Sequence, residues 1–364
     1  MRPIDAAGLF LADLSERMMP GADSTRARAV LDRACGGQLA ARAKDGRPAS
    51  ALTVSGIPLE ASVSGGSGQF TPAVRYATEA GTQELDSSVR FAEYHAAIRD
   101  LTAWLPERVD PTGAAEMLSS FVATLLPDPT KLAARHRSAA CLGIVHHALD
   151  PGHLARLKVY GLFIDPGATD RVRAAWPSFA PLGGVPDNET MIRPLGAALE
   201  LDARGELTHK VYLRVRHNDP AAPMKLVRHF GDAAWEVLAE LDRCGVDTAT
   251  LHRHTLFVCC ARRGSAPASF ALYVGARGQE NFPDSITELA TRHHGGTDAV
   301  DTLTLAAESA GAQWHWGGFG IGFAPTRGVD KFGVYGTPVW NATGVLSAAP
   351  RNDRGGVKFV HVPS

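Results

Sequence analysis

The sequence predicts an α+β fold in which ten antiparallel strands close into a barrel surrounded by a ring of helices. Five segments each contain two strand patterns joined by a turn rich in Gly, Pro or Asp, and helical patterns fill the stretches between them. From the second hairpin onward, the hairpins begin roughly every 50–60 residues, a period typical of repeated supersecondary units. The five hairpins are expected at about 51–79, 141–164, 192–216, 254–276 and 313–340.

Closure of the ten strands is favoured because it removes the unpaired edges of the sheet. A ring of ten strands is wider than one of about eight, whose side chains just fill the interior, so a ligand cavity is expected. The alternative is two separate α+β layers. The regular spacing of the hairpins and the lack of a linker favour a single domain over residues 1–364.

Helices are expected before the first hairpin and between the others. The opening MRPIDAAGLFLADLSERMM carries acids inside its apolar stretch, which indicates an amphipathic helix rather than a signal peptide. Apolar residues at three- and four-residue spacing predict helices over 91–105 and 117–125, and their clearest stripe runs over 226–241. Ile286 and Leu289 indicate a shorter helix before His293.

Composition points to a soluble globular protein. The 364 residues include 37 Lys and Arg against 38 Asp and Glu, and 45% are hydrophobic. This balance gives no electrostatic reason to expect a nucleic-acid or membrane partner, and no apolar run reaches the roughly 20 residues that span a bilayer. Five scattered cysteines without a CxxC pair indicate buried thiols in a reducing compartment. We therefore expect a cytoplasmic protein, either a monomer or a homodimer.

Strand alternation places a group of cations and tyrosines on one face. Lys210, Tyr212 and Arg214 share a face of their strand, opposite Val211 and Leu213. The apolar face should lie under the helices, which directs the Lys, Tyr and Arg side chains into the barrel. The second strands of the other hairpins repeat the pattern with Arg75, with Lys158 and Tyr160, with Tyr273, and with Lys331 and Tyr335.

Such a lumen suits a highly charged anion beside an organic cation. Several Lys and Arg side chains in a low-dielectric space require an anion such as diphosphate, and tyrosine ring faces can stabilise a cation next to it. These are the requirements for ionising an allylic diphosphate. Glu60, on the first strand, could hold an N–H or O–H of an aromatic acceptor and later take a proton. The alternatives are an exposed edge carboxylate or a partner of Arg75.

At these residues the sequence resembles the aromatic prenyltransferases of the dimethylallyltryptophan synthase type, the indole branch of the ABBA barrel superfamily, and especially its bacterial members. The resemblance extends over nearly the whole chain, from GIPLEASV to FGVYGTPVW. The individual motifs are short, and their order, spacing and strand placement together carry the resemblance. The matching positions are Gly56, Pro58 and Glu60, Arg75, Lys158 and Tyr160, Lys210 and Tyr212, Tyr273 and Tyr335.

The resemblance implies a barrel of repeated ααββ units that moves a dimethylallyl group from dimethylallyl diphosphate to tryptophan or an indole-containing metabolite. The reaction it implies is a Friedel–Crafts-type substitution that requires no cofactor and no Mg²⁺. Glu60 would be the catalytic residue, while the matching cations and tyrosines would bind the diphosphate and shield the cation. A carbazole, a phenol or another fused arene is the alternative acceptor. The alternative from another class is a non-catalytic barrel that binds an aromatic or lipid ligand.

The sequence departs from the family pattern at several positions. Fungal members have an arginine two residues before the second Lys-x-Tyr, where this chain has Thr208. We therefore expect Arg214, Arg277 or Lys331 to supply charge to the diphosphate site. A second lysine that relays protons in some members has no match. His146 or His147 could replace it, although a structural histidine is favoured. Trp316 could belong to the core or to the wall of the acceptor pocket.

Other motifs are weak. No DDxxD clamp for Mg²⁺, GxSxG or HExxH occurs, and SGGSG at 64–68 is expected to form a hairpin turn rather than a phosphate loop. The glycines of GGFGIGF at 317–323 are expected to give barrel curvature or room for a bulky substrate rather than a dinucleotide site. The pairs 252/254, 293/294 and 259/260 of His or Cys lack a third ligand at a suitable spacing, so no metal site is expected.

Overall fold

The computed structural model describes residues 2–21, 23–53, 55–132, 138–147, 153–182, 191–276 and 282–340. Its strands are β1 (Leu59–Gly66), β2 (Gln69–Phe70), β3 (Arg75–Thr78), β4 (Ala140–His146), β5 (Leu154–Leu162), β6 (Ile192–Asp202), β7 (Leu207–Val215), β8 (Thr255–Arg263), β9 (Ser269–Gly275), β10 (Gln313–Ala324) and β11 (Gly328–Val339).

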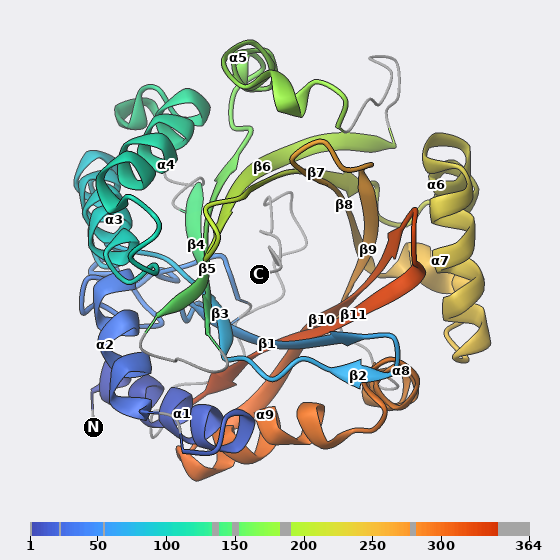
Figure 1. Cartoon of the computed structure of the whole chain (residues 1–364), viewed down its shortest axis with the longest axis horizontal. Coiled ribbons are helices and arrows are strands. Elements are labelled where there is room, and N and C mark those ends of the chain that lie inside the picture. Colours follow the sequence, from blue (N-terminus) through green and yellow to red (C-terminus); the bar gives the residue numbers. More distant parts are fainter. Residues whose placement is uncertain are drawn as a thin grey trace.

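These strands form one closed antiparallel ring. The order is β11-β10-β9-β8-β7-β6-β5-β4-β3-β1, and β11 pairs with β1 to complete the circle, while the two-residue β2 extends β1 at its edge. The predicted ten-stranded barrel is therefore confirmed, and Figure 1 shows the helices outside it. Because β1 and β11 are neighbours, the ring needs both the first and the last hairpin of the chain.

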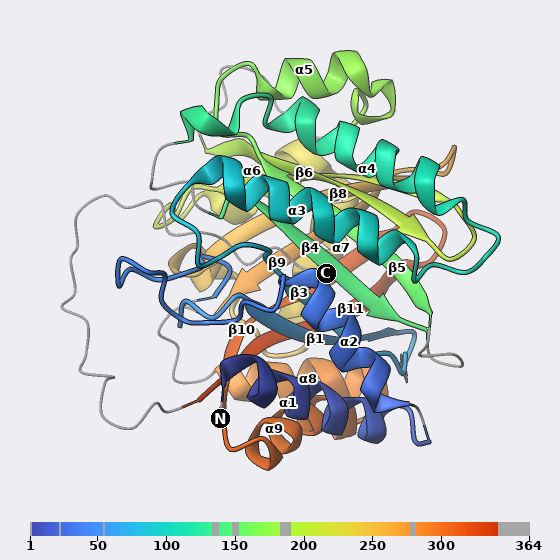
Figure 2. The same cartoon turned by 90° about the vertical axis from the view of Figure 1, so that its left-hand side faces the viewer.

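Nine α-helices are described around the barrel. They are α1 (Pro3–Met18), α2 (Ser24–Ala34), α3 (Ser87–Thr102), α4 (Pro111–Leu125), α5 (Ala168–Ala175), α6 (Ala222–Phe230), α7 (Asp232–Arg243), α8 (Phe282–His294) and α9 (Asp298–Ser309). Short 3₁₀ helices cover Pro129–Lys131, Pro177–Phe179 and Thr248–Arg253. Figure 2 shows α3 and α4 lying side by side over one wall of the barrel, in agreement with the contacts between α4 and β5.

Local sequence sets where these helices begin. Asp86 accepts a hydrogen bond from the backbone N–H of Ser88 at the start of α3. Asp110 accepts from two backbone N–H groups at the start of α4, whose first residue is Pro111. Such caps satisfy N–H groups that have no partner within the helix. The helices and strands alternate as five units, each with a hairpin and two helices, except that the third has α5 and a 3₁₀ turn.

Some boundaries differ from the sequence prediction. The first strand begins at Leu59 rather than near residue 51, and Gly56 in the preceding segment has a φ of +80°. The apolar stripe over 226–241 is divided into α6 and α7 at Gly231, whose φ of +57° ends the first helix. Helices α2, α5 and α9 were not predicted from the sequence.

The barrel wall separates two hydrophobic clusters. On β7, Val211 and Leu213 belong to the outer cluster, between the barrel and the helices, while Tyr212 belongs to the inner one. The assignment of the Lys and Tyr face to the lumen is thus confirmed for this strand. The inner cluster contains Leu52, Ala77, Cys141, Tyr160, Ala198, Tyr212, Phe257, Cys259, Tyr273 and Tyr335.

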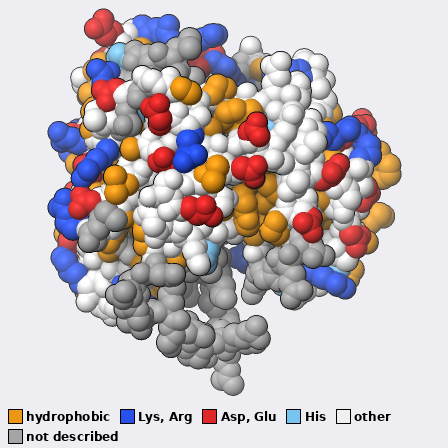
Figure 3. Space-filling view, turned by 90° about the horizontal axis from the view of Figure 1, so that it is seen from below, with side chains coloured by type: hydrophobic (Ala, Val, Ile, Leu, Met, Phe, Trp, Pro, Cys, Tyr) orange, Lys and Arg blue, Asp and Glu red, His pale blue; other side chains and the backbone are white. Residues whose placement is uncertain are grey.

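The state of the cysteines and the distribution of surface charge match what the composition predicts. All five cysteines are buried and free of disulfide bonds. Basic and acidic side chains are interspersed over the described part of the face that Figure 3 shows. Within the described segments, no helix is long and apolar enough to cross a bilayer.

Candidate active site

The centre of the lumen holds two lysines and a glutamate from three neighbouring strands. Lys158 on β5 and Lys210 on β7 flank Glu200 on β6, and all three residues are at most 9% exposed. Glu200 Oε2 lies 2.8 Å from Lys210 Nζ and 3.1 Å from Lys158 Nζ. Burial acts to raise the pKa of Glu200, but the charges of Lys210, Lys158 and Arg156 outweigh it and hold that pKa well below its usual value.

Arg75 and Tyr335 lie on either side of β1. The register pairs Ser62 of β1 with Arg75 of β3 on one side and with Tyr335 of β11 on the other. Residues directly opposite each other in an antiparallel pair share a face, so all three face the lumen. Burial and the nearby charge of Arg156 lower the pKa of Arg75 to about 10, which leaves the guanidinium charged at neutral pH.

Two further cations complete the group, which we call the cationic cluster: Arg75, Arg156, Lys158, Lys210 and Lys331. Arg156 has the same strand parity as Lys158, and its Nη1 lies 3.6 Å from Glu200 Oε1. Lys331 lies opposite Gly322 in the β10–β11 pair and is half-buried. Burial, with the charges of Lys210 and Arg75, lowers the pKa of Lys331 to about 8. The cluster therefore has more positive charge than Glu200 can balance.

Four tyrosines adjoin the cationic cluster, and we call them the tyrosine cluster: Tyr160, Tyr212, Tyr273 and Tyr335. The rings of Tyr160 and Tyr212 have centroids 5.8 Å apart, and those of Tyr273 and Tyr335 are 6.0 Å apart. Lys158 Nζ donates a hydrogen bond to the Tyr160 hydroxyl over 2.9 Å. Burial raises the pKa of each tyrosine above its usual value, so all four keep their hydroxyl protons at neutral pH.

Glycines on neighbouring strands make room for these rings. A Cβ added at Gly320 would lie 2.3 Å from Cε1 of Tyr273, and one at Gly143 would lie 3.0 Å from Cε2 of Tyr160. A Cβ at Gly333 would lie 2.9 Å from the Tyr335 hydroxyl. The space that Gly320 leaves in the glycine-rich strand at 317–323 is thus taken by a tyrosine ring and not left for a bulky substrate.

Glu60 faces the lumen from β1, two residues before Ser62. Its neighbours Leu59 and Ala61 belong to the outer cluster, and its own side chain is only 3% exposed. The alternative of an exposed edge carboxylate is therefore wrong. Glu60 lies close enough to Tyr335 for its charge to contribute to the raised pKa of that hydroxyl.

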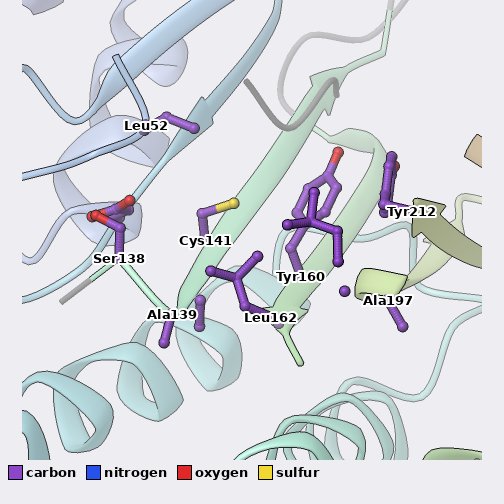
Figure 4. A pocket seen from close by; sticks show the side chains of 13 residues that line it. Leu52, Ser138, Ala139, Cys141, Tyr160, Leu162, Ala197 and Tyr212 are labelled. Carbon is purple, nitrogen blue, oxygen red and sulfur yellow. The ribbon is translucent and has the colours of Figure 1, made fainter. Parts of the chain in front are cut away.

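A small pocket opens beside Tyr160 and Tyr212, at the end of the barrel where β5 ends and β6 begins (Figure 4). Its lining is mostly apolar. One acid, Glu79, lines it, and Ser138 Oγ donates a hydrogen bond to this carboxyl over 3.0 Å. Burial raises the pKa of Glu79 to about 7. The lining is Leu52, Glu79, Ser138, Ala139, Ala140, Cys141, Tyr160, Gly161, Leu162, Leu195, Gly196, Ala197 and Tyr212.

Three other candidates from the sequence lie on β7, on β10 and at the end of β4. Arg214 lines an open groove with Arg193 and Arg216 near the end of β7. His147 follows β4, and its backbone N–H donates to His153. Trp316 packs against Trp314 and the outer cluster, not in the lumen, so the structure gives it the core position. Arg277 lies outside the described residues.

Three residues near the site were missed by sequence reasoning. Glu200 and Arg156 have lumen parity on β6 and β5, and that parity was the available signal. Glu79 follows β3 with the parity of Arg75, but nothing in the sequence indicated that it lines a pocket.

A second cluster of polar groups lies outside the barrel. Ligand atoms of Glu240, Cys244 and His293 lie within 4.8 Å of one another, which the sequence spacing did not reveal because α7 and α8 carry them. Arg243 and Arg292 already form ion pairs with the Glu240 carboxylate. Two guanidinium groups on that carboxylate disfavour an additional cation there.

Solved structures with the same barrel fold are aromatic prenyltransferases. The 5-dimethylallyltryptophan synthase of Streptomyces coelicolor matches with a TM-score of 0.66 at 18% identity, over 92% of this chain and 97% of that one. The prenyltransferase PriB, solved with L-tryptophan and dimethylallyl thiolodiphosphate, has a TM-score of 0.66 at 18% identity, over 94% and 99%. The 6-dimethylallyltryptophan synthase of Micromonospora olivasterospora has a TM-score of 0.67 at 17% identity, over 93% and 97%.

These likenesses confirm the resemblance at the level of the fold: this chain has the barrel of the dimethylallyltryptophan synthases. Sequence comparison adds no closer assignment. No family model matches the chain. No curated protein matches it either.

Proposed function

We propose that this protein is an aromatic prenyltransferase that moves a dimethylallyl group from dimethylallyl diphosphate to the indole of tryptophan or of an indole-containing metabolite. The observation that carries the proposal is the arrangement in one lumen of a buried carboxylate, Glu60, the cationic cluster and the tyrosine cluster. The fold likeness supports it, because PriB was solved with tryptophan and a thiolo analogue of the same donor.

The proposed reaction begins with cleavage of the bond between the allylic carbon and the diphosphate oxygen. The diphosphate leaves with the electron pair, and the cationic cluster holds its charge. Two π electrons of the aromatic ring then form the new C–C bond to the allyl cation. The proton on the attacked ring carbon leaves with Glu60 as the base, and the electrons of that C–H bond restore the aromatic ring.

The tyrosine cluster would protect the cation during this sequence. Ring faces attract a cation through their quadrupole, and the buried rings also keep water from capturing it. We propose that the donor requires neither a cofactor nor Mg²⁺, since arginine and lysine side chains supply the charge that a metal would. The nature of the acceptor depends on the pocket beside Tyr160, and a carbazole, a phenol or another fused arene would use the same chemistry.

A non-catalytic barrel that binds an aromatic or lipid ligand is the alternative. A carrier would have no use for a base opposite a cluster of cations, which favours the enzyme. We further propose a single catalytic domain over residues 1–364, acting in the cytoplasm on small molecules only, with no nucleic-acid or membrane partner and as a monomer or a homodimer.

Glu60→Gln tests the proposal, with Glu116→Gln on the exposed side of α4 as the matched control. Single-turnover transfer to tryptophan should fall at least about a hundredfold in Glu60→Gln, the usual contribution of a general base. The affinity for diphosphate should stay within about threefold, because Glu60 is not part of the cationic cluster. Unchanged turnover in Glu60→Gln would contradict the role of Glu60. Absence of diphosphate binding in the unaltered protein would contradict the donor site itself.

A further inference from the structure

Glu200 takes up the same ammonium groups that the donor needs. A single oxygen, Oε2, accepts from Lys210 Nζ over 2.8 Å and lies 3.1 Å from Lys158 Nζ. Each ammonium has three N–H donors, and both lysines direct one of them at this single oxygen. Those two donors, and the charge that Glu200 neutralises, are withheld from a second anion.

Strand pairing holds Glu200 beside the two lysines. It lies directly opposite Lys158 in the β5–β6 pair, and both residues are at most 5% exposed. A buried carboxylate without cations would be costly, so the lysines stabilise it as much as it stabilises them. The other oxygen, Oε1, lies 3.6 Å from Arg156 Nη1, so the carboxylate keeps a partner when the lysines turn to another anion.

We propose that Glu200 is a built-in competitor of diphosphate: it neutralises Lys158 and Lys210 in the empty barrel and repels the diphosphate that shares them. The inference rests on the proposed function, since it concerns the diphosphate site. Its consequence is weaker binding of both donor and released diphosphate, which favours product release. Glu200 thus modulates donor binding and takes no part in the chemical steps.

The charged groups around Glu200 determine whether loss of its charge strengthens or weakens diphosphate binding. Arg156 and Lys158 face it from β5 and Lys210 faces it from β7, while Arg75 and Lys331 act on it from β3 and β11. All five are cations, so within this group the Glu200 carboxylate is the element that repels an incoming anion. Removing its charge strengthens the attraction for diphosphate, because like charges at such distances repel strongly in a buried site.

An orienting role would give the opposite result. If Glu200 served only to hold the lysines in place, its loss would misplace them and diphosphate would bind more weakly. The direction of the change in affinity therefore separates the two roles.

The experiment measures the binding of inorganic diphosphate by calorimetry at neutral pH. Glu200→Gln keeps the shape of the side chain and removes its charge. The matched control is Glu206→Gln in the turn of the same hairpin, where the carboxylate is 56% exposed and pairs with Arg263 instead. We expect at least about tenfold tighter binding in Glu200→Gln and a change below about twofold in Glu206→Gln.

Glu200→Asp is the second variant, for the case that Glu200→Gln does not fold. Its carboxylate keeps the charge but is withdrawn from the lysines by one methylene, so binding should tighten by less than in Glu200→Gln. Unchanged or weaker binding in a folded Glu200 variant would overturn the inference while leaving the proposed function intact. Failure of the unaltered protein to bind diphosphate would overturn both.

Discussion

Lys158 donates a hydrogen bond to the hydroxyl of Tyr160 over 2.9 Å, and both side chains are buried in the barrel. One bond thus links the group that would hold the leaving diphosphate to the group that would shield the cation. Burial and the nearby charge of Lys210 hold the pKa of Lys158 well below its usual value. The charged form of this lysine therefore depends on its neighbours, the Tyr160 oxygen included.

Tyr160→Phe should weaken diphosphate binding. The substitution removes an acceptor that stabilises the charged form of Lys158. Diphosphate must then bind a lysine that is less readily charged, at a cost of about 1 kcal/mol, or about fivefold in affinity. Calorimetry with inorganic diphosphate measures this change in affinity. The control is Tyr94→Phe, whose hydroxyl donates to the Cys141 carbonyl over 2.7 Å and lies between α3 and the barrel. That variant should lose stability without losing affinity. Equal affinity in Tyr160→Phe and the unaltered protein would contradict the role of this bond.

Diphosphate binding should weaken as the pH rises above about 8. The pKa of Lys331 in the ligand-free protein is lowered to about 8, so its ammonium is charged below that pH and becomes neutral above it. Bound diphosphate stabilises the charged form, so at higher pH binding must also take up a proton. Between about pH 7 and pH 9 the affinity of the unaltered protein should fall more steeply than that of Lys331→Arg, whose guanidinium stays charged. Parallel pH profiles would exclude Lys331 from the site.

Gly320→Ala should destabilise the barrel by about 1–3 kcal/mol, as expected when a methyl is forced into a filled space. The new Cβ would lie 2.3 Å from the Tyr273 ring. Gly322→Ala, two residues further along the same face, is the control, because its Cβ would meet nothing closer than Lys331 Cβ at 3.3 Å. Urea denaturation gives the free energy of unfolding of each variant for comparison with the unaltered protein. If Gly320→Ala lost no more stability than Gly322→Ala, the Tyr273 ring would not be fixed against this strand.

Cys141→Phe tests whether the pocket beside Tyr160 holds the acceptor. Cys141 lines that pocket and lies opposite Tyr160 in the β4–β5 pair, so a phenyl ring there would fill the space. We expect the KM for the aromatic acceptor to rise by about tenfold or more, with diphosphate affinity unchanged. Cys141→Ala, which only enlarges the pocket, is the control. A rise in KM that is no larger than in this control would place the acceptor elsewhere in the lumen.

The lumen residues could be predicted from the sequence because strand alternation is a local rule. Parity alone separates Lys210 and Tyr212 from Val211 and Leu213, and no knowledge of neighbouring strands is needed. Parity also holds for Glu200, but its position between two lysines depends on the register of β5, β6 and β7, which the sequence does not determine.

Trp316 shows where the local rule fails. Counted by parity from Gly320, Trp316 would face the lumen. The β10–β11 register shifts between Trp316 and Gly318, and the extra residue of this bulge turns Trp316 to the outer face. A bulge has no reliable signal in a single glycine-rich strand. The approach of Glu240 to His293 could not be foreseen either, because the two residues lie on different helices that are far apart in the sequence.

The proposed function requires that this barrel transfers a prenyl group to an aromatic ring. Mass spectrometry of the purified protein with dimethylallyl diphosphate and EDTA, against tryptophan, cyclic tryptophan dipeptides, tyrosine, naphthols and carbazoles, tests it most directly. We expect one C5 unit to be added to an indole, and Glu60→Gln to abolish the product. Transfer to a non-indole arene alone would keep the reaction and change the acceptor. Absence of transfer to every acceptor, with tight binding of an aromatic ligand, would contradict the claim and favour a carrier.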